Sequence, residues 1–254
     1  MIKIDKGNPP AALVRAKVQH DQINNAAYLL DPPGYNSGHK KFSFTEAYKS
    51  ASVKKTLNIV QNGKCCFSEA KFVNDDAHVE HFRPKGFVEN KVTGAISYPG
   101  YYWLAYDWSN LFYCKSTTNS SFKRNFFPLV KRGRRKKNHL DNTVEVCVLI
   151  DPSTDDPRQH IRFRNEEIKG VTSRGKKTIE LLDLRNGQLD EARRTKFNYL
   201  RAMKNAADLM ISNGIPMDTP QLIALIHELK QSILPQAEFS SMAIDFLQGW
   251  PHLH

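Results

Sequence analysis

The segment Val79-Glu80-His81-Phe82-Arg83-Pro84-Lys85 places a carboxylate directly before an imidazole, with a proline and two cations close behind. Further along come Trp108-Ser109-Asn110-Leu111 and then NSSFKRNFFPL, from Asn119 to Leu129. Together they offer a general base, an acidic metal ligand, two amides and several cations. These are the groups needed to hydrolyse a phosphodiester bond with one divalent metal ion.

Local sequence signals predict how these segments fold. Residues 78–82 are expected to form a strand that ends before Pro84, because proline cannot donate a ladder hydrogen bond. Residues 111–114 are expected to form a second strand, and residues 119–125 a short helix that stops before Pro128. Side chains alternate along a strand, so Glu80 and His81 would face opposite sides. Both reach one site if the strand ends or bends at His81, which Pro84 favours.

Each group suits one part of the reaction. An imidazole ordinarily titrates near neutral pH, so His81 is expected to take the proton from an attacking water. Glu80 can bind Mg²⁺ or Mn²⁺ through oxygen, and Asn119, early on its helix, can complete the protein ligands. The simpler alternatives are an ion pair of Glu80 with Arg83 or Lys85, and a helix N-cap role for Asn119.

Further polar residues have supporting roles in this interpretation. The amide of Asn110 is expected to bridge backbone groups between strand and loop and so orient the site. Arg83 and Lys85 either contact phosphate or are ordinary solvated cations. The run KRGRRKKN at 131–138, which includes Arg134 and Arg135, is either a solvated loop or a track for the nucleic-acid backbone.

The rest of the chain predicts an α+β protein in three parts. Residues 1–62 form an N-terminal helical lead-in, with a helix at 11–30, one or two helices in 42–62 and a stop at Gly63. Residues 63–170 hold the core with additional strands, at 144–150 and around 161–168. Residues 171–254 form a C-terminal helical bundle, with helices at 175–184, 189–213, 220–234 and 237–247.

Composition narrows the class of partner. The 254 residues carry 37 Lys and Arg against 26 Asp and Glu, a formal charge of +11 that favours nucleic acid over other polyanions. No apolar run approaches the roughly 18 residues of a membrane span. The start MIKIDKGNPP has no signal-peptide core, so we expect a cytoplasmic protein with no membrane partner. The four cysteines lack the spacing of a disulfide scaffold.

The motifs VEHFRPK, YYWLAYDWSNL and NSSFKRNFFPL resemble those of an HNH endonuclease with a ββα-metal core. More narrowly, they resemble the HNH subunits of bacterial anti-phage systems of the Septu type, including copies that accompany some retrons. The resemblance extends to GKC at 63–65 with Glu69, to IDP at 150–152, and to HIRF at 160–163.

This resemblance implies roles for several residues. His81 would be the catalytic base, Glu80 and Asn119 the metal ligands, and Asn110 the orienting residue. Lys123 and Asn125 would lie on the same helix, near the bound phosphate or as its support. The resemblance also implies an ATPase partner of the ABC/SMC-like type.

The chain departs from the family at its cysteines. Family members place four thiolates around a structural zinc, and the matching positions here are Cys65, Ser68, Lys115 and Thr118. Cys66 and Cys114 lie one residue out of register. A tetrahedral thiolate site would then need shifted loops. We therefore expect no structural zinc, with aromatic packing in its place, by Phe67, Phe72, Phe112 and Phe122.

Two classes of function follow. The first is a metal-dependent endonuclease that serves as the effector of a defence system. The second is a nucleic-acid-binding or scaffold subunit whose nuclease site is degenerate, an alternative that the incomplete cysteine set keeps open. The effect of removing His81 on cleavage separates the two.

Overall fold

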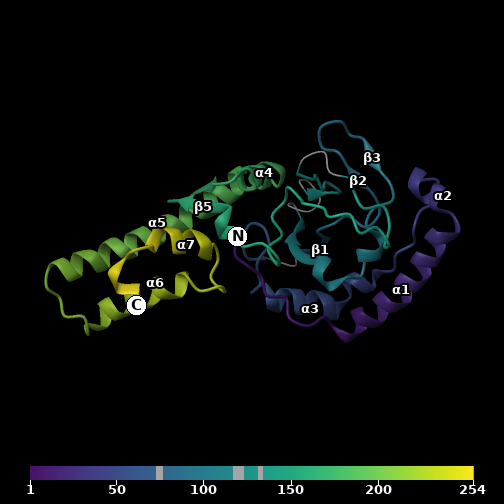
Figure 1. Ribbon diagram of the computed structural model, residues 1–254. Coiled ribbons are helices and arrows are strands. Elements are labelled where there is room, and N and C mark those ends of the chain that lie inside the picture. The colour runs from purple at the N-terminus through teal and green to yellow at the C-terminus, as the bar shows by residue number, and fades with distance from the viewer. Residues whose placement is uncertain (73–76, 117–122, 131–133, 254) are drawn as a thin grey trace.

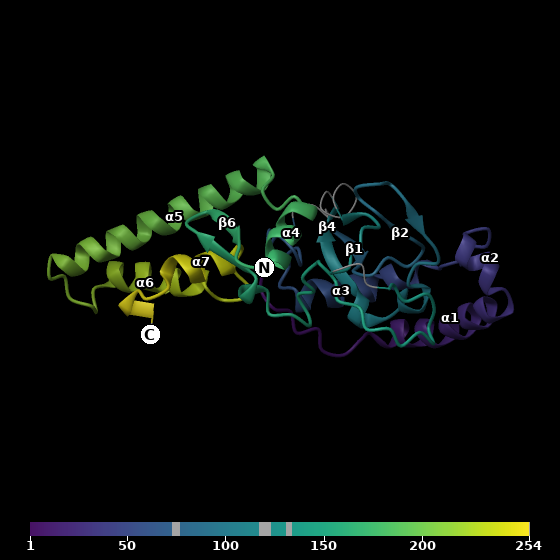
Figure 2. The same cartoon turned by 45° about the horizontal axis from the view of Figure 1, so that its top comes forward.

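The protein is elongated, with two parts joined near the middle of the long axis (Figure 1). The computed structural model describes residues 1–72, 77–116, 123–130 and 134–253. The N-terminal helices and a pair of strands form one part, and helices α5 (Gly187–Ser212), α6 (Pro220–Ser232) and α7 (Ser240–Leu247) form the other. Helix α4 (Ser173–Leu181) lies between them, and the hairpin of β5 (Ile161–Arg164) and β6 (Glu167–Gly170) contacts both α4 and α7 (Figure 2).

The N-terminal helices follow the sequence closely. Helix α1 spans Ala11–Leu30, as predicted, and begins directly after Pro10. The short α2, Pro32–Ser37, is capped by Asp31, whose carboxylate accepts a hydrogen bond from the Gly34 amide at 2.9 Å. The predicted helical region before Gly63 contains the 3₁₀ helix η1, Glu46–Lys49, and helix α3, Ala51–Val60. Gly63 has a φ of +67°, which suits glycine and ends this region.

The two predicted strands pair with each other. Strand β1, Ala77–His81, runs antiparallel to β4, Leu111–Lys115, with Val79 opposite Tyr113, Glu80 opposite Phe112 and His81 opposite Leu111. Because side chains alternate, one face of the pair packs on α1 and α3, through Leu13, Val53, Leu57, Val79, Leu111 and Tyr113. The opposite face carries Phe112 and Cys114 into a second core, with Cys65, Phe67, Phe82 and Phe127. The strand pair therefore lies between two hydrophobic cores.

The predicted strand at 144–150 is wrong. The segment makes a single antiparallel bridge, between Cys147 and Leu129, and no strand is assigned to it. Val144 is 88% exposed and Val146 52% exposed. A β-branched composition favours a strand only where the side chains find neighbours to pack against, and here half of them face solvent.

The irregular stretch at 86–100 contains a short hairpin of β2, Val88–Glu89, and β3, Ile96–Ser97. Glu89 also forms a parallel bridge with Phe126, so the hairpin lies against the segment that follows the predicted site helix. That helix was predicted at 119–125. Its residues 119–122 lie outside the described residues, so the ββα arrangement stays a prediction.

The C-terminal third is helical, in agreement with its periodicity. The hairpin β5, Ile161–Arg164, and β6, Glu167–Gly170, corresponds to the predicted short strand pair. The helices are α4, Ser173–Leu181; α5, Gly187–Ser212; α6, Pro220–Ser232; and α7, Ser240–Leu247. Thr172 and Asn186 cap α4 and α5 through their side chains. The α+β class is confirmed.

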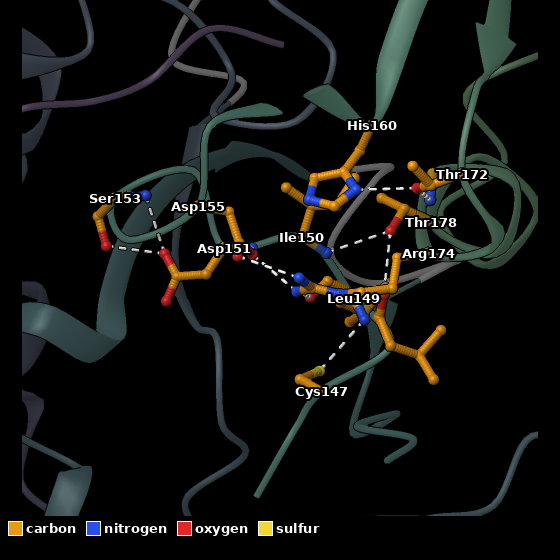
Figure 3. Close-up of polar contacts among 12 residues, drawn as sticks. Cys147, Leu149, Ile150, Asp151, Ser153, Asp155, His160, Thr172, Arg174 and Thr178 are labelled. Atoms are coloured by element: carbon orange, nitrogen blue, oxygen red, sulfur yellow. Dashed lines mark hydrogen bonds and ion pairs between the residues drawn. The ribbon is translucent and has the colours of Figure 1, made fainter. Parts of the chain in front are cut away.

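The motif around Ile150-Asp151-Pro152 joins the core to helix α4 (Figure 3). Arg174 donates to both carboxylate oxygens of Asp155, at 3.0 and 2.7 Å, and to the carbonyl oxygen of Leu149 at 3.0 Å. The Ile150 amide donates to the Thr178 hydroxyl at 3.1 Å. This part of the motif is therefore structural.

None of the helices in the described residues has both the length and the apolar composition that a membrane crossing requires.

Candidate active site

A pocket of about 410 Å³ opens where strand β1 ends. Its lining combines acidic, basic, imidazole and aromatic groups, from Tyr48, Val79, Glu80, His81, Pro84, Lys85, Arg124 and Asn125. Four of the residues that the sequence suggested thus share one pocket: Glu80, His81, Lys85 and Asn125. Side chains alternate along β1, yet Glu80 and His81 reach the same pocket. They can do so because His81 is the last residue of the strand and Pro84 follows in the loop.

The orientation of His81 is set by a backbone group. Its Nε2 lies 2.9 Å from the carbonyl oxygen of Ala105. A carbonyl only accepts, so Nε2 carries the hydrogen and Nδ1 of the neutral ring keeps its lone pair. Burial, with the positive charges of Lys85 and Lys123, lowers the pKa of His81 to about 3. The ring is therefore neutral at neutral pH, the form that a general base requires.

Glu80 is held on the opposite face of the strand. Its Oε1 lies 3.1 Å from the ammonium of Lys123, and both side chains are buried. Lys123 also donates to the carbonyl oxygen of His81 at 3.3 Å. Burial raises the pKa of Glu80 against the opposing effect of Lys123. Lys123, which is 1% exposed and does not line the pocket, thus holds the acidic residue in place.

Two cations approach the pocket from different segments. The Lys85 ammonium lies 4.2 Å from the centre of the Tyr48 ring, and burial lowers the pKa of Lys85 to about 8. The Arg124 guanidinium is half exposed, pairs with Glu89 at 3.3 Å and lies over the Phe126 ring. Arg124 has a φ of +42°, a strained conformation for a non-glycine residue. Positive groups on two sides of an open pocket suit a phosphate group.

Asn110 braces the loop that leaves β1. Its Oδ1 accepts from the Arg83 amide at 2.7 Å, and its Nδ2 donates to the carbonyl oxygens of Arg83 at 3.0 Å and Leu104 at 3.1 Å. The side chain is buried and does not line the pocket. Asn110 therefore fixes the backbone on both sides of the site, between the strand and the segment that carries Ala105.

Besides the buried Lys123, three predicted substrate-binding residues lie away from the pocket lining. Arg83 lies over the Phe127 ring and near Glu145, at 3.9 Å. Arg135 donates to the Tyr101 hydroxyl and to the Phe127 carbonyl oxygen, both at 2.8 Å. Arg134 is exposed beside Asp141, at 3.3 Å. The lysine and arginine at 131–132 lie outside the described residues, so the path of the whole basic run stays a prediction.

The predicted metal ligand Asn119 also lies outside the described residues. Within them, the pocket offers the Glu80 carboxylate and the His81 imidazole. The Glu80 carboxylate fits a hard cation, since Mg²⁺ is usually bound by one or two carboxylates and completes its shell with water and substrate phosphate. The Lys123 ammonium disfavours cation binding, because this ammonium already neutralises one oxygen of Glu80.

The cysteine side chains lie closer together than their positions in the sequence motif suggested. The sulfur atoms of Cys65, Cys66 and Cys114 all lie within 4.8 Å of one another, and those of Cys65 and Cys114 are 3.8 Å apart. Burial raises the pKa of Cys66 and Cys114. A structural zinc takes four ligands, and three thiols meet here among the described residues. The expected absence of zinc stays a prediction.

Two of the polar pocket residues had not been identified from the sequence. Arg124 stands between Lys123 and Asn125 in the quoted motif, so its neighbours were a usable signal. Tyr48 lies far upstream in η1, outside the expected core, and no local pattern marks it. Its place in the pocket depends on how the N-terminal segment packs on β1.

The fold and the pocket define an α+β protein with an acidic residue, a neutral imidazole and two cations at the end of a strand pair. In sequence, the chain is 38% identical over 157 residues to Septu protein PtuB of Bacillus mycoides (strain KBAB4), which covers 60% of this chain and 53% of that protein. It is 30% identical over 194 residues to Septu protein PtuB of Bacillus thuringiensis, which covers 75% and 56%.

The chain spans about half the length of these curated relatives. No model of a protein family matches it. The similarity to Septu proteins agrees with the narrower resemblance of the motifs. The names of the two relatives specify neither an HNH nuclease nor a retron.

Proposed function

We propose that the chain is a metal-dependent endonuclease of the HNH type, which hydrolyses phosphodiester bonds in nucleic acid. The observation that supports this most directly is the orientation of His81. Its Nε2 lies 2.9 Å from the Ala105 carbonyl oxygen, so the lone pair of the neutral ring is on Nδ1. Glu80 and Lys85 line the same pocket.

The chain's own residues perform four tasks in this proposal. Nδ1 of His81 takes the proton from the attacking water while the water oxygen bonds to phosphorus and the bond from phosphorus to the leaving oxygen breaks. The leaving oxygen takes a proton from solvent at the open pocket. The Ala105 carbonyl stabilises the imidazolium through the Nε2 hydrogen. Lys85 and Arg124 bind the oxygens of the scissile phosphate. Asn110 holds the loop and thereby keeps the base in place. Glu80 and Asn119 would hold Mg²⁺ or Mn²⁺, which supplies Lewis-acid stabilisation of the developing phosphoryl charge when bound.

The similarity to Septu proteins extends the proposal to a biological setting. The chain would act as the effector subunit of an anti-phage defence system of the Septu type. An ATPase of the ABC/SMC-like class would be its partner and would control the cut. The net charge of +11 supports nucleic acid as the substrate class.

The second candidate is a nucleic-acid-binding or scaffold subunit with a degenerate site. One observation favours it specifically. The ammonium of Lys123 already pairs with Oε1 of the buried Glu80, so a divalent cation would have to share that carboxylate with a fixed positive charge.

Cleavage by wild type and by His81→Ala tests the proposal. The purified protein, with and without its partner ATPase, is incubated with DNA and with RNA in Mg²⁺ or Mn²⁺. We expect His81→Ala to lose about 100-fold or more in rate, because it lacks the general base. His78→Ala is the matched control, since His78 is an exposed residue of the same strand and should leave the rate within about twofold.

The outcomes separate the two candidates. Binding without any cleavage by wild type, under all of these conditions, supports the degenerate-site alternative. Equal cleavage by wild type and His81→Ala removes His81 as the base while leaving a nuclease.

A further inference from the structure

Glu80 and His81 receive their support from different parts of the chain. Glu80 faces the second core, where Lys123 holds it. The His81 side chain points to the same face of the strand as Val79, and α1 and α3 cover that face. Lys123 therefore lies on the other side of the strand from the imidazole ring, which is contacted by a different element.

That element is η1, in the N-terminal lead-in. The Tyr48 ring lies 4.6 Å from the His81 ring, centre to centre, with an angle of 60° between the planes. The same ring lies 4.2 Å from the Lys85 ammonium. One aromatic side chain thus contacts both the candidate base and a candidate phosphate-binding cation. An aromatic ring attracts a cation over its face, and it also restricts a neighbouring ring by packing.

The segment carrying Tyr48 is itself anchored. The Thr45 amide donates to the Tyr106 hydroxyl at 2.7 Å. Tyr106 stacks on His20 of α1, with ring centres 4.4 Å apart and an angle of 13°. Tyr106 directly follows Ala105, whose carbonyl takes the Nε2 hydrogen of His81. The two contacts that orient the imidazole are therefore tied to one another through Tyr106.

We propose that Tyr48 is a positioning residue, which fixes the His81 ring and the Lys85 ammonium in the arrangement used for cleavage. The N-terminal lead-in is then part of the active site. This inference rests on the proposed nuclease function. Tyr48 makes no contact with the reacting atoms in this proposal, and its aromatic ring provides the positioning.

The kinetic test compares Tyr48→Phe, which keeps the ring, with Tyr48→Leu, which removes it. We expect Tyr48→Leu to lower kcat by about tenfold or more, because a misplaced base loses rate steeply, and to raise KM through the freed Lys85. Tyr48→Phe should stay within about twofold. Phe72→Leu is the control, because it removes a half-buried ring 4.8 Å from Tyr113 that does not line the pocket. A Tyr48→Leu kcat within twofold of wild type would overturn the proposal.

A spectroscopic test needs no activity. Nitrogen chemical shifts of His81 at neutral pH report which ring nitrogen carries the hydrogen. We expect wild type and Tyr48→Phe to be protonated at Nε2, and Tyr48→Leu to show a mixture of tautomers or a broadened signal. An unchanged, sharp His81 signal in Tyr48→Leu contradicts the proposal. If Tyr48→Leu does not fold, Tyr48→Met fills the volume without a planar ring and is judged by the same readings.

The two tests distinguish separate failures. If wild type cuts no nucleic acid, the nuclease proposal fails, and the nitrogen shifts still decide whether Tyr48 orients the imidazole. If wild type cuts and Tyr48→Leu cuts equally well, the nuclease proposal stands and the role of Tyr48 is rejected.

Discussion

The ammonium of Lys123 lies 3.1 Å from Oε1 of Glu80, and neither side chain is more than a few per cent exposed to solvent. Glu80 lines the same pocket as His81, and Lys123 lies behind the lining. A buried carboxylate is costly without a positive partner, so Lys123 lets Glu80 remain at this position. Because Lys123 neutralises part of the charge of Glu80, less negative charge remains to bind a metal ion. The pair therefore bears both on stability and on the choice between the two functions.

Breaking this pair should destabilise the protein strongly. We expect Lys123→Met to lower the free energy of unfolding by about 3 kcal/mol, because it leaves a buried carboxylate unpaired. Denaturant titration measures the change. Lys177→Met is the matched control, since its pair with Glu180 at 2.8 Å is exposed and screened by water, and little change is expected there. If the Lys123→Met, Glu80→Met double variant recovers none of the loss, the pair is not its cause.

Glu69 should give the protein a specific sensitivity to acid. Burial raises the pKa of Glu69, but the Met1 amino group, Lys64 and Ser241 outweigh it and hold the pKa at about 2. A carboxyl whose folded pKa lies below its usual 4.5 stabilises the fold above that pH and loses this effect as the pH falls toward 2. The contribution amounts to about 3 kcal/mol.

The measurement is the difference in unfolding free energy between wild type and Glu69→Gln across this range of pH. We expect it to be largest above pH 4.5 and to shrink as the pH falls. Glu180→Gln is the control, because that carboxylate is exposed and should show little dependence. If the difference in unfolding free energy between wild type and Glu69→Gln does not change with pH, the low pKa of Glu69 is rejected.

Arg134 and Arg135 should behave differently although they are neighbours. If the basic run contacts phosphate, Arg134→Ala should reduce the salt dependence of nucleic-acid binding by about one unit of slope. Arg134 is exposed, so its removal should hardly affect stability. Arg135→Ala should lower the free energy of unfolding by about 1–3 kcal/mol, because Arg135 bonds to Tyr101 and Phe127. An unchanged slope for Arg134→Ala assigns that residue to a solvated loop.

The cysteine cluster allows a direct test for zinc. We expect no tightly held zinc, because three thiols meet among the described residues and a structural site needs four ligands. Elemental analysis of purified protein after mild chelation gives the answer. One zinc per chain that survives chelation would reject this expectation. Its loss in Cys114→Ser would then place the metal at this cluster.

Much of the fold was predictable because it depends on local signals. Helix α1 matches its prediction residue for residue, since prolines bound it on both sides. Strand β1 ends before Pro84 as expected. The strand predicted at 144–150 failed for a physical reason: β-branched residues favour a strand only where the tertiary fold supplies a partner and a packing face.

The sequence by itself determined the chemical groups of the site and the segments that carry them. Glu80, His81, Lys85 and Asn125 were all named from their motifs, and the structure places them around one pocket. The tertiary structure alone decided what holds these groups. Tyr48 packs on His81, Lys123 pairs with Glu80, and Ala105 sets the ring's hydrogen. Each is a contact between segments distant in sequence, and such contacts depend on packing that no local pattern encodes.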